Sequence, residues 1–140
     1  MEHKRYGNTV IVRMDPGEEI LEQMEIAAKA ENVKLGSVSA IGAVNDFTVG
    51  LYDVAEKQYF PNRFTGAYEI VSLLGNITTM DGKYYAHLHM AAADETGSTV
   101  GGHLNRAVIS VTCEMFITEI EGEINRGKDE KTGINVFRFE

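Results

Sequence analysis

The sequence is poor in cysteine and proline and contains no tryptophan. Its only cysteine, Cys113, cannot form an intrachain disulfide, and the apolar run around it (108–117) predicts a small buried side chain rather than a nucleophile. The two prolines, Pro16 and Pro61, do not mark a linker, and neither an internal repeat nor a low-complexity segment is present.

Long apolar runs are also missing from the sequence. No stretch is long enough to span a bilayer, and the N-terminus lacks the apolar core of a secretory signal. We therefore expect no membrane association and a cytoplasmic location.

Positive charge is scarce, with 13 Lys and Arg against 21 Asp and Glu and a formal net charge of −8. The basic residues are scattered, and the closest pair is Lys4–Arg5 at the N-terminus. Because a net-negative domain repels a phosphate backbone unless it carries a dense basic patch, direct DNA binding by this chain alone is disfavoured.

The 140 residues fit one domain, and 44% hydrophobic with 24% charged residues is typical of a globular protein. We expect a single domain over residues 1–140, in which residues 1–7 form a flexible N-terminal segment.

Hydrophobic periodicity predicts one main helix and about seven strands. The helix is expected from an N-cap at Asp15, with Glu18 completing a capping box, to about Glu31. Seven strands are expected at Thr9–Met14, Ser37–Val44, Phe47–Asp53, Glu69–Thr79, Lys83–Ala93, Ala107–Ile120 and Ile134–Phe139, and Lys57–Phe60 is a weaker candidate for one more short strand. Hairpin turns are expected at Asn45-Asp46 and Met80-Asp81-Gly82, and a polar loop at Gly127–Gly133. The pattern indicates an α+β fold with a mainly antiparallel sheet.

The segment 83–106 contains three of the four histidines. Alternation along strand Lys83–Ala93 places its even-numbered apolar residues in the core and projects His87 and His89 together from the other face. Two imidazoles so placed can converge on one metal ion, and His103, which follows Gly101-Gly102, is the candidate third ligand.

Three histidines would leave a fourth coordination position open, as in catalytic or ligand-accepting zinc sites. We expect zinc, although another divalent transition metal would also suit imidazole ligands. The alternative is that the His-x-His pattern occurs by chance on a solvated face.

Other polar residues are weaker candidates. Glu114 lies mid-strand in an apolar run and could orient a histidine or accept a proton as a catalytic residue, or it could line a subunit interface or face solvent. Asp94 and Glu95 follow the histidine strand in an expected loop, and His3 is expected to be solvated.

Five segments resemble the plants and prokaryotes conserved domain family. They are VIVRMDPGEEI (10–20), VSAIGAVNDFTVGLYD (38–53), GAYEIVSLLGNI (66–77), HLHMAAAD (87–94) and GGHLNRAVISVTCEMFI (101–117). The resemblance runs from Val10 to the C-terminus. It implies a mostly antiparallel α/β fold assembled as a homotrimer, and it implies that His87, His89 and His103 match histidines that hold zinc in some prokaryotic members.

Plant members of that family carry an AT-hook before the domain, and this sequence has no such hook. Our first hypothesis is therefore a homotrimeric zinc-binding module that recognises a small molecule or a protein partner. The alternative is a zinc-dependent hydrolase or lyase that uses the three histidines and Glu114, and a DNA-binding regulator is third. Whether the protein is an enzyme stays open.

Overall fold

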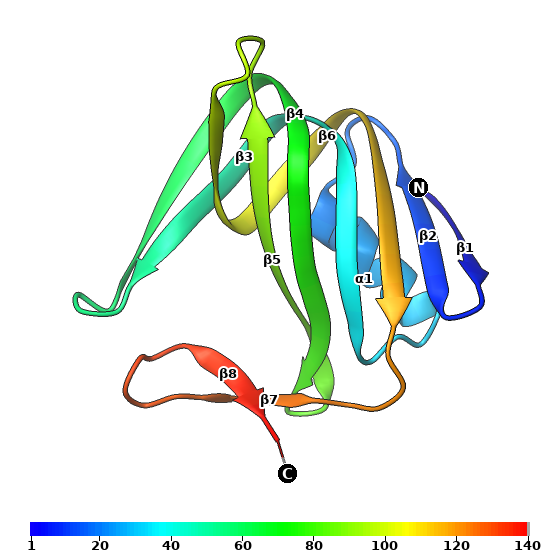
Figure 1. Cartoon of the computed structure of the whole chain (residues 1–140), viewed down its shortest axis with the longest axis vertical. Coiled ribbons are helices and arrows are strands. Elements are labelled where there is room, and N and C mark those ends of the chain that lie inside the picture. Colours follow the sequence, from blue (N-terminus) through cyan, green and yellow to red (C-terminus); the bar gives the residue numbers. More distant parts are fainter. Residues whose placement is uncertain (140) are drawn as a thin grey trace.

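Eight strands and one helix make up residues 1–139, the part of the chain that this computed structural model describes (Figure 1). The elements are β1 (Glu2–Tyr6), β2 (Thr9–Met14), α1 (Ile20–Ala30), β3 (Gly36–Asp53), β4 (Gln58–Met80), β5 (Lys83–Ala93), β6 (Thr99–Glu119), β7 (Asn125–Lys128) and β8 (Asn135–Arg138). The single helix in this part of the chain is not long and apolar enough to cross a membrane.

All strands belong to one sheet in the order β1-β2-β6-β3-β4-β7-β8, and β5 pairs with both β4 and β6. Strands β3, β4, β5 and β6 therefore form a closed circuit of antiparallel pairs. The only parallel pairing within residues 1–139 joins Thr79 of β4 to Asn125 of β7. The predicted class is thus correct in outline, and the sheet is mixed at this one point.

The core lies inside this curved sheet, with α1 packed against β2 and β6. The helix buries Ile20, Met24, Ala27 and Ala28, which is the apolar stripe that its periodicity predicts. Phe47 of β3 is the largest fully buried side chain.

The helix begins later than the sequence suggested. Glu18 does accept the Asp15 amide as a capping box would, but Gly17 takes a φ of +88°, which ends any helix started at Pro16. The working N-cap is Glu19, whose carboxylate accepts the amide hydrogens of Glu22 and Ala107 and so joins α1 to β6.

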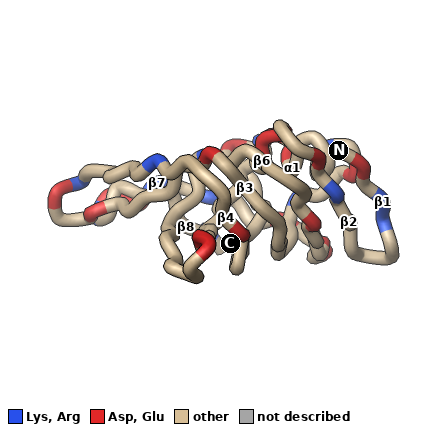
Figure 2. The backbone as a smooth tube through the Cα atoms, turned by 90° about the horizontal axis from the view of Figure 1, so that it is seen from above, with Lys and Arg blue, Asp and Glu red and all other residues tan. Residues whose placement is uncertain are grey.

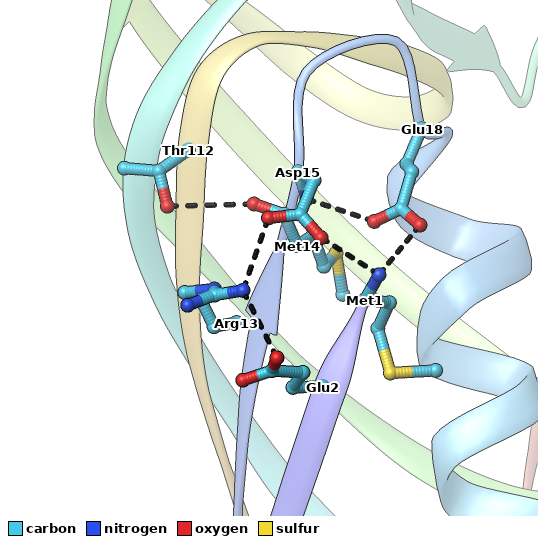
Figure 3. Close-up of polar contacts among 7 residues, drawn as sticks. All are labelled: Met1, Glu2, Arg13, Met14, Asp15, Glu18 and Thr112. Carbon is cyan, nitrogen blue, oxygen red and sulfur yellow. Dashed lines mark hydrogen bonds and ion pairs between the residues drawn. The ribbon is translucent and has the colours of Figure 1, made fainter.

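The expectation that residues 1–7 form a flexible segment is wrong. Residues 2–6 pair with β2 over five register positions, and Arg5 donates hydrogen bonds to the carboxylates of Glu31 and Glu119. The amino group of Met1 lies 2.7 Å from a Glu18 oxygen (Figure 3). Alternation alone did not reveal this strand because its apolar content is low.

The prediction of a hairpin turn at Asn45-Asp46 is also wrong, since β3 runs unbroken through both residues. The strand carries irregularities in its pairing there, and the turn comes after Asp53 instead. Asp46 is held in the sheet by Arg63 and Arg106, whose guanidinium groups lower the pKa of its carboxyl to about 2.

The hairpin predicted at Met80-Asp81-Gly82 is confirmed. Met80 pairs with Lys83, and both turn residues have positive φ, 51° at Asp81 and 70° at Gly82, as a two-residue hairpin requires. Strand β5 has the predicted bounds, and β6 begins eight residues before the prediction, at Thr99 rather than Ala107. This early start carries His103 into the sheet.

Candidate metal centre

The pairing of β5 with β6 brings the three predicted histidines together. His89 and His103 are direct partners in the antiparallel register, and His87 precedes His89 by two residues on the same face. One ring nitrogen from each histidine can be chosen so that all three lie within 4.8 Å of one another. The Nε2 atoms of His87 and His89 are 3.3 Å apart.

The glycines before His103 allow close approach rather than a turn. A Cβ on Gly101 would lie 2.6 Å from the Met90 carbonyl oxygen, and one on Gly102 would lie 2.6 Å from the carbonyl oxygen of Gly50. Both contacts are shorter than real Cβ atoms tolerate. These glycines therefore let β6 pass tightly against β5 and β3 where the third histidine enters the cluster.

The site keeps two of its imidazoles neutral. Burial, followed by the charges of His103, Arg126 and His89, lowers the pKa of His87 to about 4. Burial, followed by the charge of His89, also lowers the pKa of His103. Neutral imidazole is the form that binds a metal ion, so these rings are ready to coordinate near neutral pH without losing a proton.

The spacing fits a small tetrahedral ion. Bonds of about 2.0–2.1 Å at a tetrahedral centre separate two ligand nitrogens by about 3.3–3.4 Å, which matches the two Nε2 atoms of His87 and His89. Among residues 1–139 the metal-competent group contains only the three histidines, without a cysteine or a carboxylate. The arrangement can thus supply three neutral nitrogen ligands and leave a position for an outside group.

A phenol lies on the β6 side of the cluster. The ring of Tyr59, from β4, packs edge-on against His103 with centroids 6.0 Å apart. Its hydroxyl bonds to the side chain of Asn105 and lies 3.3 Å from the main-chain oxygen of His103. Burial raises the pKa of this hydroxyl, which therefore stays a hydrogen-bond donor.

A buried guanidinium lies on the β4–β5 side. Arg126 of β7 is only 7% exposed and packs against the rings of Tyr85 and Phe137, 4.8 and 4.4 Å from their centroids. It donates to the side chain of Asn76, which is the direct cross-strand partner of His87. Arg126 could not be predicted from the sequence, because a lone arginine in a short polar hairpin carries no periodic signal.

Glu114 does not join the histidines within one chain. It pairs with Ile41 of β3, so that β3 and β4 lie between it and the histidine strand β5. Asp94 uses its carboxylate in the β5–β6 turn, where it accepts hydrogen bonds from Thr96 and Ser98.

Two other residues also lie apart from the cluster. His3 pairs with Glu31 beside α1. Cys113 is buried, which raises the pKa of its thiol to about 12 and agrees with an unreactive core side chain.

The sequence matches the model of the Plants and Prokaryotes Conserved (PCC) domain over residues 1–121. A curated relative is the bifunctional protein GlmU of Synechococcus sp. strain JA-3-3Ab, with 33% identity over 125 residues. That match covers 87% of this chain and 19% of the relative, so the chain spans about a fifth of the length of that protein.

Two solved structures are similar over nearly their whole length. A Bacteroides thetaiotaomicron protein, described as a candidate DNA-binding protein, has a TM-score of 0.95 and 28% identity, covering 99% of this chain and 96% of its own. A protein of Archaeoglobus fulgidus, described as metal-containing, has a TM-score of 0.89 and 32% identity, covering 96% of each chain.

Proposed function

The chain belongs to the plants and prokaryotes conserved domain family, and from that premise we propose that it is a zinc-binding module whose three histidines present one metal ion to a small molecule or partner. His87, His89 and His103 supply the protein ligands. The bound ion acts as a Lewis acid that accepts an oxygen of the ligand at its remaining position.

The observation that carries this proposal is the 3.3 Å separation of the His87 and His89 Nε2 atoms, with His103 paired to His89. At this distance one neutral imidazole can donate its N–H to the other, and a metal ion bound by both rings would take the place of that hydrogen. The lowered pKa of His87 agrees with a ring kept neutral for coordination. Support also comes from the Archaeoglobus relative, which is described as metal-containing.

Zinc is the metal that this ligand set favours. Three imidazoles without a thiolate or carboxylate suit zinc and other borderline divalent ions, whereas calcium and magnesium prefer oxygen ligands. The test is the metal content of protein purified from zinc-supplemented cells. We expect about one zinc per chain in the wild type and its loss in the variant His87→Ala/His103→Ala.

The matched control is His3→Ala, which removes the one histidine outside the cluster and should leave the zinc content unchanged. Circular dichroism of each variant separates loss of metal from loss of fold. A wild type that stays free of stoichiometric metal after zinc supplementation would refute the proposal.

We extend the proposal to a homotrimer, as the family resemblance implies. Apolar side chains are exposed together on the outer face of strands β3, β4 and β6, which pair with one another. They are Ile41, Val71, Leu74, Val111 and Phe116. A contiguous apolar face of this kind is usually covered by another protein, and symmetric copies of the same chain are the common solution.

The hydrolytic alternative has less support because Glu114 is separated from the histidines by two strands within the chain. The metal site alone therefore favours binding over a defined reaction. The activities of GlmU do not transfer to this chain, which corresponds to a fifth of that protein.

DNA binding is the weaker candidate despite the description of the Bacteroides relative. Basic positions are spread along the backbone and interleaved with acidic ones (Figure 2), on a chain with a net charge of −8. Duplex binding that weakens steeply with salt would overturn this view.

A further inference from the structure

The buried guanidinium of Arg126 carries a charge that the described part of the chain does not neutralise. Its acceptors are the hydroxyl of Thr78, the amide oxygen of Asn76 and the main-chain oxygen of Asn135, all of them neutral. Within residues 1–139 no carboxylate is among its hydrogen-bond or ion-pair partners. A buried cation without an anion is costly, so an outside anion would stabilise it.

Arg126 also has donors left for such an anion. A guanidinium carries five N–H groups, and the three hydrogen bonds use three of them. The rings of Tyr85 and Phe137 pack against the guanidinium, with centroids 4.8 and 4.4 Å from its central carbon, so a further partner would bind through the remaining N–H groups. The two remaining N–H groups, one on each terminal nitrogen, are donors of the kind that bind carboxylates.

Asn76 links Arg126 to the histidine cluster. The Nη2 atom of Arg126 is 2.7 Å from the side-chain oxygen of Asn76, and Asn76 stands directly opposite His87 on the adjoining strand. Arg126 thus lies toward His87, whereas Tyr59 packs against His103.

The charges of the loaded site point to the ligand. Three neutral imidazoles leave the two positive charges of a zinc ion uncompensated, and Arg126 adds a third beside them. We propose that Arg126 is the anion-binding residue of the histidine site, and that the site takes a small dicarboxylate. One carboxylate binds the edge of Arg126 and the other occupies the open position of the ion. This inference rests on the proposed metal site for the second contact only.

Isothermal titration of zinc-loaded and metal-free protein with malonate, succinate and acetate tests the inference. We expect the zinc-loaded wild type to bind malonate or succinate at least about tenfold more tightly than acetate, because a second charge-assisted contact is added. Arg126→Met should lose about tenfold or more of that affinity. Arg126→Lys keeps the positive charge but lacks the paired N–H donors of the guanidinium, so its dicarboxylate affinity should fall between those of the wild type and the methionine variant. It also covers the case in which the methionine variant does not fold.

The matched control is Arg138→Met on the same hairpin, because the exposed Arg138 donates only to a main-chain oxygen in the described structure. It should bind like the wild type. Equal dicarboxylate affinity in the folded Arg126 variants and the wild type would overturn the inference, as would a zinc-loaded wild type that prefers acetate or binds none of the three.

Zinc content, measured on every sample, keeps the two proposals apart. If the wild type holds zinc but its dicarboxylate affinity does not depend on Arg126, only the inference fails. If the wild type holds no zinc and dicarboxylate binding still depends on Arg126, the metal site and the second contact fail, and Arg126 remains the anion-binding residue. If neither zinc nor a dicarboxylate binds, both are wrong.

Discussion

Gly75 of β4 lies so close to β5 that a Cβ at this position would be 2.2 Å from the main-chain oxygen of His87. The same Cβ would be 2.8 Å from the Cα of Leu88, so neither contact can be relieved by a side-chain rotation. This glycine therefore fixes the distance between β4 and β5 at the point where the side chain of His87 projects from β5.

Replacing Gly75 by alanine should separate β4 from β5 at His87. We expect the free energy of unfolding to fall by about 1–3 kcal/mol, the usual cost of overpacking, and zinc affinity to fall as well because His87 moves. Urea unfolding and zinc competition with a chelating dye measure the two effects. Ser72→Ala on the same strand is the control, and a Gly75→Ala variant as stable as the wild type would contradict the close packing.

The cap at Glu19 should contribute measurably to stability. Its two carboxylate oxygens accept the amides of Glu22 in α1 and Ala107 in β6 at 2.9 and 2.8 Å. Glu19→Ala leaves both amides without this acceptor and should lower the free energy of unfolding by about 1–3 kcal/mol. Glu22→Ala, in the same helix, should have a much smaller effect in the same denaturant titration, and equal effects would argue against the cap.

The metal-free protein should lose stability as the pH falls from 6.5 to 4. The pKa of His87 is lowered from 6.5 to about 4 in the folded chain, so in this window the unfolded chain binds a proton that the folded chain does not. Acidification therefore favours unfolding. Denaturant titrations of wild type and His87→Asn across this range should show a shallower decline in the variant, and parallel declines would contradict a neutral buried ring.

The proposed trimer depends on the exposed apolar face that includes Val111, which is 64% exposed. Val111→Asp should shift the mass in sedimentation velocity from three times 15.5 kDa toward a single chain. Ile26→Asp, at a comparably exposed residue on α1, should leave the mass unchanged. A wild type that sediments as a single chain would rule out the trimer.

Much of the sheet could be predicted from alternation, because β2 buries every second side chain and β5 does so from Leu88 to Ala92. Val111 shows where this rule fails. Strict alternation would bury it together with Ile109 and Cys113, but the register between β3 and β6 shifts at this point, and the shift turns Val111 outward. Such irregularities depend on the neighbouring strand, which the local sequence does not specify.

Only part of the candidate site could likewise be predicted from the sequence. The His87 and His89 pair follows from a period of two along one strand, and His103 could be added from its glycines and the family resemblance. Arg126 and Tyr59 reach the cluster from strands far away in the chain, and only the pairing of β4 with β5 and β7 brings them there. No local pattern marks either residue.

The most direct test of the central claim is zinc K-edge X-ray absorption on the zinc-loaded wild-type protein. Three histidine ligands with one open position predict a four-coordinate ion with three imidazoles and one oxygen at about 2.0–2.1 Å. The spectrum should show the outer-shell scattering of three imidazole rings, and it should lose most of it in His87→Ala/His103→Ala but not in His3→Ala. A six-coordinate oxygen shell, or fewer than three imidazoles in the wild type, would contradict the three-histidine site.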